Sequence, residues 1–431
     1  MLDLRRRSLR AAVLAVSAAS LTAGLVSCGG SSDVATSGMS CRALAPGITP
    51  AAIKVGVILP DTGPAASSFR AFRAGVDARF DSVNEEEGGI YGRQITYAWR
   101  DNGGVSDLNE HAAQELVTDE RVFGIVQEPS AAGGSIGWLN EQGVPVTGLA
   151  LDSNWQGMNN MFSWYYFGKG STTTWGQYLR GRGVSRVVVF ATGVNATSVD
   201  SNQKIVASLR ASRIQVVKTF WVAETTTSFQ NLAQQTKAAN VDGIAGVLVP
   251  EAAAQLLPDL RGVGLTLGGS LKAALLPLGY DSSVLEKEGP ALAGVSIATL
   301  VNPFENDTPG QRKFRQAMTA YSPETQPPTQ DSAVYGWLSA DLFIRGLRAA
   351  GKCPTRESFI TNLRAVKDYD GSGMTAPDRN DLSTNFREPS ACYSVVEISP
   401  DGQHFVPQND GQPYCGTAIT PEQLKQLNQG P

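Results

Sequence analysis

From residue 53 onward, short apolar runs alternate with longer segments whose apolar residues recur at helical spacing. The run "IKVGVILP" at 53–60 is typical of a buried strand. The next apolar residues recur as on one face of a helix: Phe69, Phe72, Val76, Phe80 and Val83. Gly88 and Gly89 are expected to end that helix. This order of elements constrains the fold more than any other feature of the sequence.

The same alternation continues along most of the chain. Further strands are predicted at 93–101, 122–126, 144–150, 186–191, 214–222, 243–249, 292–300, 392–399 and 404–408. Helices are predicted at 107–120, 132–143, 199–212, 229–240, 252–264, 308–321, 329–350 and 355–365. Pro258 is expected to interrupt the helix at 252–264. Alternation of this kind indicates parallel sheets covered by helices on both faces, here in two α/β lobes.

The cleft between two such lobes is the expected ligand site. In open α/β sheets, ligands bind outside the carboxyl ends of the strands. Two lobes that face each other place both sets of strand ends around one cleft. A chain of 431 residues also exceeds one ordinary hydrophobic core, which agrees with two domains.

For the body of the chain, charge argues against nucleic-acid binding and hydropathy argues against a membrane-spanning segment. The formal net charge is −4 and no basic block is present, so nucleic acid is not expected as a partner. No apolar run after the N-terminal region is long enough for a transmembrane helix.

The N-terminal region has the layout of an export signal. Residues 1–10 are basic, and residues 11–26 are apolar or small and carry no charge. "LVSC" at 25–28 resembles the bacterial lipobox, which implies removal of residues 1–27 and a lipid on Cys28. The paired Arg6 and Arg7 leave open export by the general or the twin-arginine route. Residues 28–50, rich in Gly, Ser, Ala and Pro, are predicted to be a flexible tether. The protein is therefore expected outside the cytoplasm, lipid-anchored at the outer face of the cell membrane or in the periplasm.

Four cysteines remain after Cys28, and an even number in an exported chain favours disulfides. Three connectivities are possible, and we favour Cys392 with Cys415, which leaves Cys41 with Cys353. The irregular cysteine spacing and the presence of only two histidines argue against a zinc cluster. No metal and no cofactor are expected.

Several motifs resemble the branched-chain amino acid type of ABC-transporter substrate-binding protein. They are "IKVGVILPDTGPAA", "NEEEGGIYGRQITYAWRDNGG", "VFGIVQEPSAAG", "EQGVPVTGLA", "GVSIATLVNPF" and "DSAVYGWLSADLFIRGL", within residues 50–365. The resemblance implies the type I periplasmic-binding fold, in which three connections join two Rossmann-like lobes. Lobe I would comprise 51–170 plus 304–378, lobe II 171–303 plus 379–420, and 421–431 would form a tail. It further implies a monomer that closes around a small molecule and delivers it to an ABC permease.

In this family, two loops of lobe I contact the ligand. The first follows the "GIV" strand, and here it offers Ser130 with the backbone amides of Ala131 and Ala132. Ser130 could also cap the next helix, and the two roles are compatible. The second loop holds Leu149, Ala150 and Asp152, and it has Leu151 at the position of the family's threonine.

Lobe II departs from the family pattern. Asn195 aligns with the family's tyrosine, and "LKAALLPLGY" contains no acidic residue for a ligand ammonium before Tyr280 and Asp281. An unpaired ammonium in a closed cleft is costly, so a standard amino acid is not expected unless Asp281 or Glu251 substitutes.

Aromatic residues are dense between the predicted lobes, at 155–175. Most of them are expected in the core, but some, with Trp164 and Tyr165 as candidates, should line the cleft. The expected ligand is therefore amino-acid-like, or an apolar or aromatic carboxylate or amide.

Two other functions are compatible with parts of the sequence. Residues 133–137, "GGSIG", match the nucleophile motif of serine hydrolases, with Ser135 as nucleophile and His404 as base. Ser135 lies nine residues after the preceding strand, whereas that motif needs serine on the turn directly after it, so no enzyme is expected. A ligand sensor of the same fold, which signals to a partner rather than to a permease, is the second alternative.

Overall fold

The computed structural model describes residues 41, 44–63, 66–129, 131–192, 196–223, 226, 228–377 and 379–429. Residues 41–431 form one compact unit. Cys28, with the predicted signal peptide and most of the predicted tether, lies outside the described residues, as do Ser130 and Asn195. The described end of the predicted tether is packed: Ile48 is buried, and the amide of Lys54 donates to the carbonyl of Gly47 over 2.7 Å.

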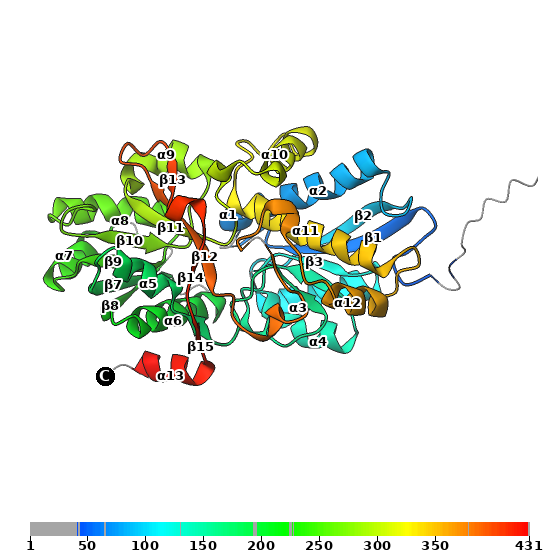
Figure 1. Cartoon of the computed structure of the whole chain (residues 1–431), viewed down its shortest axis with the longest axis horizontal. Coiled ribbons are helices and arrows are strands. Elements are labelled where there is room, and N and C mark those ends of the chain that lie inside the picture. The colour runs from blue at the N-terminus through cyan, green and yellow to red at the C-terminus, as the bar shows by residue number, and fades with distance from the viewer. Residues whose placement is uncertain are drawn as a thin grey trace, which may run out of the picture. The chain divides into compact units, whose positions relative to one another are not determined.

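The first sheet is parallel and has the strand order β2-β1-β3-β4-β5. Its strands are β1 (Ala52–Leu59), β2 (Gln94–Asp101), β3 (Ile125–Gln127), β4 (Val146–Gly148) and β5 (Met161–Phe162). Val57 packs into one hydrophobic cluster and its neighbour Ile58 into another, because successive strand residues point to opposite faces. Helices cover both faces, and this half of the fold is called lobe I (Figure 1).

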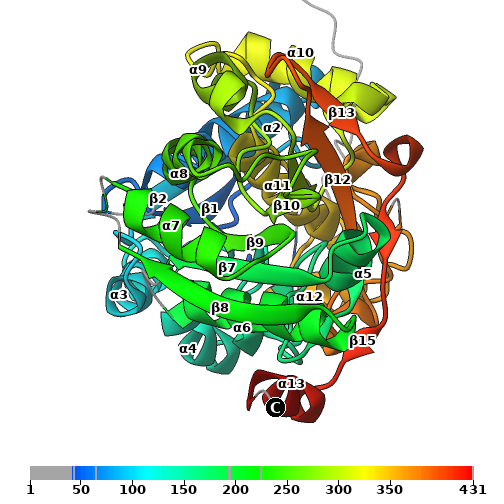
Figure 2. The same cartoon turned by 90° about the vertical axis from the view of Figure 1, so that its left-hand side faces the viewer.

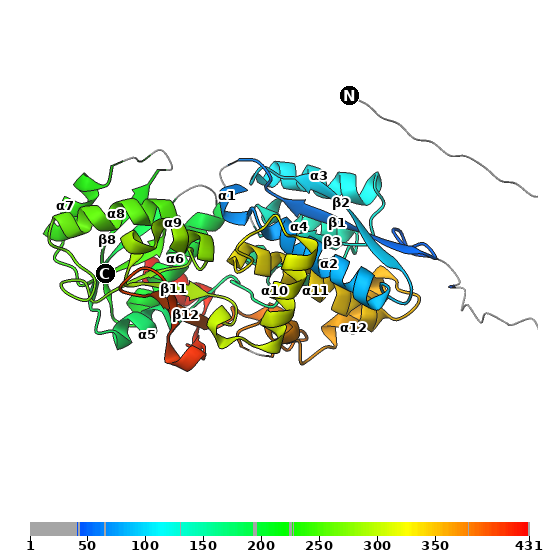
Figure 3. The ribbon, with the colours of Figure 1, turned by 90° about the horizontal axis from the view of Figure 1, so that it is seen from above.

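The helices of lobe I come from both ends of the chain. They are α1 (Ala66–Phe69), α2 (Phe72–Glu87), α3 (Ser106–Thr118), α4 (Ile136–Glu141), α10 (Pro309–Tyr321), α11 (Asp331–Ala350) and α12 (Arg356–Arg364). The buried α11 packs along α2, and the two helices lie beside α10 and α12 in Figure 3. Lobe I therefore depends on helix α11, which follows all the parallel strands of the other lobe in sequence.

The second sheet is mixed and defines lobe II. Its strand order is β13-β12-β11-β10-β9-β7-β8, and only β12 and β13 run antiparallel to their neighbours. The strands are β7 (Arg186–Thr192), β8 (Gln215–Val222), β9 (Gly243–Val247), β10 (Ala273–Leu276), β11 (Val295–Thr299), β12 (Cys392–Ile398) and β13 (Phe405–Pro407). Its helices are α5 (Thr174–Gly181), α6 (Ala196–Ala211), α7 (Gln230–Ala238), α8 (Pro250–Gly262) and α9 (Ser282–Leu292).

Residues of β7 show how the second sheet is covered. Val187 and Val189 pack into a cluster with α5 and α6, whereas Val188 and Phe190 pack into the cluster that holds α7 and α8. Figure 2 shows these helices around the strands of the lobe. The predicted α/β class, with parallel sheets covered on both faces, is confirmed.

Three chain segments connect the lobes: 163–170, 300–308 and 388–391. The first and third of these connections are in contact, since the Tyr165 hydroxyl donates to the Ser390 carbonyl over 3.0 Å. The amide of Tyr166 also donates to the Ser390 hydroxyl over 3.0 Å. This arrangement is the predicted pair of lobes with three connecting strands.

The structure differs from the sequence predictions at a few elements. Pro258 does not interrupt α8, because buried Leu256, Leu257 and Leu260 hold the helix against lobe II on both sides of the proline. Strand β10, helix α9 and the last helix α13 (Pro421–Gln429) were not predicted. The four residues of β10, Ala-Ala-Leu-Leu, contain no β-branched side chain, so their sequence alone does not indicate a strand.

Both sulfur pairings follow the favoured connectivity. The sulfurs of Cys41 and Cys353 lie 2.15 Å apart, and those of Cys392 and Cys415 lie 2.05 Å apart. The second pair joins β12 to β14 (Tyr414–Cys415). The chain then forms β15 (Ala418–Ile419), which pairs with β6 (Ser171–Thr172).

Candidate functional site

A cavity of about 480 Å³ lies at the carboxyl ends of the parallel strands of lobe II. Its lining includes one residue at or just after the end of each of these strands: Thr192, Val222, Val247, Pro277 and Leu300. Parallel strands bring these ends to one edge of the sheet, which is where α/β proteins bind ligands. The cavity is within the size range of pockets that enclose drug-sized molecules.

Lobe I and the connections close the other side of the cavity. Lobe I contributes Ser68 and Phe69 from α1, Leu149 and Leu151 after β4, and Tyr335 from α11. The connections contribute residues that include Phe167, Pro389 and Ser390. The cavity is therefore an interlobe site, as the order of the sequence elements predicts.

Aromatic side chains form much of the apolar wall. They are Phe69, Phe167, Trp175, Tyr335 and Tyr393. The rings of Trp175 and Tyr393 meet edge to face with centroids 6.2 Å apart. Such a wall favours a ligand with a planar or bulky apolar part.

One face of α6 supplies four polar residues of the lobe II lining. Thr197, Ser201, Lys204 and Ser208 are spaced by three or four residues and therefore lie along one stripe of the helix. Three of these four side chains are hydroxyls, which both donate and accept hydrogen bonds. The stripe therefore gives the cavity a polar side made of three hydroxyls and one lysine.

Lys204 and Glu251 are the two charged side chains in the described lining. Only 5 % of Lys204 is exposed, and its Nζ donates to the Gly168 carbonyl over 2.6 Å and to Asp200 Oδ2 over 2.5 Å. Burial lowers the pKa of Lys204, and the attraction of Asp200 partly opposes this. Glu251 is exposed, and no ion pair reaches it from the described part of the chain. The charge of Lys204 is thus balanced by the protein, and that of Glu251 is not.

Of the described residues that were predicted to contact ligand, two line the cavity, Leu149 and Glu251. Trp164 and Tyr165 lie behind its wall. The rings of Trp164 and Tyr335 are tilted by 35° with centroids 6.3 Å apart, and those of Tyr165 and Tyr393 have centroids 5.3 Å apart. Burial raises the pKa of Tyr165 well above its ordinary value, which fits a neutral packing role.

The predicted loops of lobe I lie beside the cavity lining. Ala131, Ala132 and Ala150 are buried, and Ala131 has a left-handed backbone with φ of 57°. Asp152 accepts a hydrogen bond from the amide of Asn154 over 2.8 Å. Its carboxylate also attracts Lys204 from the opposite lobe. Leu151, at the family's threonine position, does line the cavity.

Tyr280 and Asp281 are engaged elsewhere in lobe II. Tyr280 is fully buried, its hydroxyl donates to Glu305 over 2.7 Å, and its ring packs on Phe304 and Phe405. Asp281 caps α9 by accepting from the amide of Ser283. The structure does not bring either side chain to the cavity lining.

Ser135 and His404, the two residues of the serine hydrolase alternative, lie on different lobes. Ser135 is fully buried in lobe I, and its hydroxyl has partners at 3.4 Å and 3.5 Å, the Ala132 carbonyl and the Gln127 side chain. His404 is exposed on the turn between β12 and β13 of lobe II. A buried serine on one lobe gives no accessible nucleophile for a substrate.

The described residues contain no group of three or more side chains placed to bind a metal ion. Within the same residues, no helix combines the length and hydropathy needed to cross a membrane.

Sequence comparisons identify one family. The profile of the periplasmic binding protein family matches residues 52–403. No curated protein matches the sequence significantly.

Solved structures with similar folds include three solute-binding proteins of ABC transporters. One, from R. palustris in complex with benzoate, has 19% identity, a TM-score of 0.68, and coverage of 85% of this chain and 99% of that chain. The fatty acid binding protein from Thermomonospora curvata has 19% identity, a TM-score of 0.69, and coverage of 89% and 96%. LivJ from Streptococcus pneumoniae, in complex with isoleucine, has 17% identity, a TM-score of 0.68, and coverage of 83% and 99%.

Proposed function

Because the chain belongs to the periplasmic binding protein family, we propose that it is a solute-binding protein that captures a small organic ligand in the interlobe cavity. It then presents the ligand to an ABC permease. The observation that carries this proposal is the cavity of about 480 Å³, which is lined by both lobes at the carboxyl ends of the lobe II strands.

The chemistry of the lining defines the ligand class. An aromatic wall and a stripe of hydroxyls on α6 suit a molecule with an apolar or planar body and a small number of oxygen-containing groups. Because Asp200 already balances Lys204, a ligand carboxylate would rely on hydroxyls and backbone amides. Ser130, Ala131, Ala132, Ala150, Asp152 and Asn195 are proposed as further contacts. An aromatic or aliphatic acid, or its amide, fits this description better than a free branched-chain amino acid.

Ligand capture would shift the balance between open and closed lobes. A ligand that touches both lobes binds the closed state more tightly than the open state, and so it favours closure. Leu149 and Tyr335 on lobe I face the same cavity as Trp175 and Ser201 on lobe II. A permease could then distinguish the loaded protein by its closed shape.

Membrane attachment through Cys28 is part of the proposal. Two or more acyl chains hold a protein stably at a membrane, whereas one chain is marginal. The variant Cys28→Ser should leave the membrane fraction and appear in the soluble extracytoplasmic fraction. If Cys28→Ser stays with the membrane to the same extent as the unchanged protein, the lipid anchor is refuted.

A thermal-unfolding screen tests ligand binding. The exported Cys28→Ser protein would be mixed with benzoates, aliphatic acids, their amides and branched-chain amino acids. A ligand at 100 times its dissociation constant should stabilise the folded protein by about 2.7 kcal/mol. We expect the shift with an apolar acid or amide, and not with leucine.

Two tryptophan variants locate the bound compound. Trp175→Ala removes a cavity wall and should abolish the ligand-dependent shift, whereas Trp138→Ala, on α4 of lobe I, should retain it. If both variants keep the shift, the compound binds elsewhere and this site is refuted. If leucine gives the largest shift, the proposed ligand class is wrong although the binding function stands.

A further inference from the structure

The C-terminal segment leaves the lobe II sheet and crosses the connections between the lobes. Residues 412–429, called here the C-terminal strap, contain β14, β15 and α13. Figure 2 shows the strap running in red from β13 down to α13. The helix packs on α6, where the Leu427 carbonyl accepts a hydrogen bond from Arg210.

The strap is fixed to the third connection by a covalent bond and by main-chain contacts. Cys415 is joined to Cys392, the first residue of β12. The next amide, of Gly416, donates to the Ala391 carbonyl over 2.9 Å. The disulfide therefore holds the strap at the point where the third connection enters lobe II.

The strap is fixed by hydrogen bonds to residues 171–174, which directly follow the first connection on the lobe II side. The Thr173 amide donates to the Thr417 carbonyl over 2.9 Å, and the Thr417 amide donates to the Thr173 hydroxyl over 2.9 Å. Strands β15 and β6 continue this pairing in the antiparallel sense.

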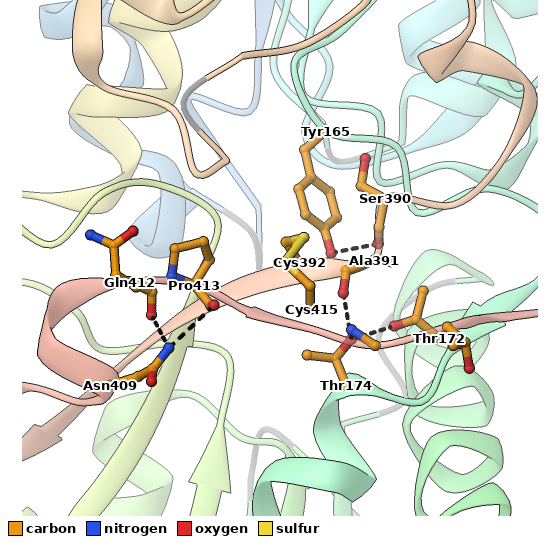
Figure 4. Close-up of a disulfide and its surroundings, with 12 residues drawn as sticks. Tyr165, Thr172, Thr174, Ser390, Ala391, Cys392, Asn409, Gln412, Pro413 and Cys415 are labelled. Carbon is orange, nitrogen blue, oxygen red and sulfur yellow. Dashed lines mark hydrogen bonds between the residues drawn. A yellow bond between two sulfur atoms is a disulfide. The ribbon is translucent and has the colours of Figure 1, made fainter.

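One hydroxyl joins all three segments. Thr174 Oγ1 donates to the Ala391 carbonyl over 2.5 Å and accepts from the Gly416 amide over 3.0 Å. Figure 4 shows Thr174 between Ala391 and Thr172, close to the Cys392–Cys415 bond. The lobe II end of the first connection, at residues 171–174, thus meets the third connection and the strap at one place.

This meeting point lies directly behind the cavity wall. Ser171 and Thr172 of β6 line the cavity, as do Ser390 of the third connection and Tyr393 of β12. Each of these residues either pairs with the strap or lies within three residues, along the chain, of a residue that contacts the strap. Movement of the strap would therefore move side chains that face a ligand.

We infer that the Cys392–Cys415 disulfide and the strap are positioning elements of the ligand site. They hold the first and third connections together on the lobe II side. When the lobes move, the connections therefore bend only in the parts nearer lobe I. The cavity wall formed by β6 and β12 keeps its shape during that movement. This role rests on contacts between described residues and goes beyond capture of a ligand.

Amide hydrogen exchange on the whole exported protein tests the role without any ligand. In the double variant C392S/C415S, peptides covering 171–174 and 389–393 should exchange at least about tenfold faster than in the unchanged protein. The β3 peptide at 125–127 should keep its rate, because it lies in the core of lobe I.

The other disulfide provides the matched control. C41S/C353S removes the same kind of bond, but between residues 41 and 353, which lie beside Arg93 of lobe I. It should leave exchange at 171–174 and 389–393 unchanged. If both double variants accelerate these peptides equally, or if neither does, the positioning role is overturned.

A second variant keeps the test valid if C392S/C415S fails to fold. Thr174→Val retains the disulfide and the shape of the side chain, but it removes the hydroxyl between Ala391 and Gly416. Thr236→Val is its control, since the hydroxyl of Thr236 is also buried in lobe II and bonds only to Leu232 within α7. Faster exchange at 389–393 in Thr174→Val alone supports the role, and equal rates in both variants overturn it. Either result leaves the ligand screen to decide the proposed function separately.

Discussion

The two lobes place their buried polar groups differently. Lobe I holds arginines inside its core, where they bind acidic or main-chain partners. Lobe II has a core of apolar side chains between its helices and sheet, and its buried lysine, Lys204, faces the cavity together with several buried hydroxyls, among them Thr172 and Ser208. The difference indicates a division of roles, with lobe I as a fixed frame and lobe II as the main recognition surface.

The charged network of lobe I joins α2 to α11. Arg79 Nε lies 2.9 Å from Asp341 Oδ1, and the Tyr369 hydroxyl donates to Asp341 Oδ2 over 3.1 Å. The Arg79 guanidinium also lies 5.2 Å from the ring centroid of Trp337. Burial raises the pKa of Tyr369 well above its ordinary value, so it acts as a neutral donor.

A second arginine of lobe I ties loops to α12. Arg364 is stacked between the rings of Phe162 and Phe386, at 3.9 Å and 4.0 Å from their centroids. Its guanidinium donates to main-chain carbonyls, which include those of Asn159 and Leu382. Such contacts fix irregular backbone that has no sheet partner, whereas the buried cation of the lobe II cavity wall is Lys204, which donates to one main-chain carbonyl and one carboxylate.

The largest predicted effect comes from breaking the Arg79–Asp341 pair. Arg79→Ala leaves a buried carboxylate without its cation, which should lower the free energy of unfolding by about 3–5 kcal/mol. The surface pair of Arg348 and Glu87 is the control, because Arg348→Ala should cost only about 0–1 kcal/mol. Denaturant unfolding of both variants measures the difference.

The same variant tests the division of roles. Where Arg79→Ala remains folded, its affinity for a ligand found in the screen should equal that of the unchanged protein. A loss of affinity greater than tenfold would show that lobe I is more than a frame.

A smaller effect is expected at Lys204 of lobe II. Lys204→Met leaves the Gly168 carbonyl and Asp200 without their donor, which should cost about 1–3 kcal/mol of stability. Because Lys204 lines the cavity, the same change should also alter ligand affinity.

Lys272 is a matched control for Lys204. Its Nζ likewise donates to a carbonyl, that of Gly183 over 2.6 Å, and to a carboxylate, that of Asp242 over 2.9 Å. It is exposed and lies beyond the opposite ends of the strands, so Lys272→Met should cost only about 0–1 kcal/mol and leave affinity unchanged. Equal effects of the two substitutions on affinity would contradict a special role of the cavity face.

The sequence is sufficient for the fold but gives only part of the candidate site. The spacing of apolar residues along the sequence predicts most strands and helices correctly, because the buried face of each element places apolar residues at regular intervals. The hydroxyl stripe of α6 was missed, although the spacing of Thr197, Ser201 and Ser208 carries the signal. Tyr335 and Tyr393 could not be found in this way, since they reach the cavity from α11 and β12 through tertiary packing. The contact of Lys204 with the Gly168 carbonyl likewise depends on how the first connection folds back.

The smallest predicted effect lies where the two lobes meet outside the cavity. Asp331, the first residue of α11 in lobe I, accepts a hydrogen bond from Thr299 of lobe II over 3.3 Å. The adjacent Gln330 forms an isolated backbone β-bridge with Asp281, whose side chain caps α9. Burial, followed by the negative charge of Asp281, raises the pKa of Asp331 well above its ordinary value of 3.8.

The sign of the resulting pH dependence follows from proton binding. Between pH 3.8 and the raised pKa, the folded protein holds a proton on Asp331 that the unfolded chain has released. Stability from this group is therefore complete below pH 3.8 and is lost as the pH rises through the folded pKa. Asp331→Asn cannot ionise, so its free energy of unfolding should rise relative to that of the unchanged protein between pH 4 and neutrality.

Asp281→Asn separates the two causes of this shift. Removing the charge of Asp281 lowers the pKa of Asp331 but leaves its burial, so the pH dependence should become weaker without disappearing. Tyr335 bonds to Asp331 and Arg70 attracts Asp281, and both are kept in each variant. Denaturant unfolding at several pH values measures the slopes. A difference between Asp331→Asn and the unchanged protein that is constant with pH would mean that the pKa of Asp331 is the same in the folded and unfolded protein, which would contradict its burial at this junction.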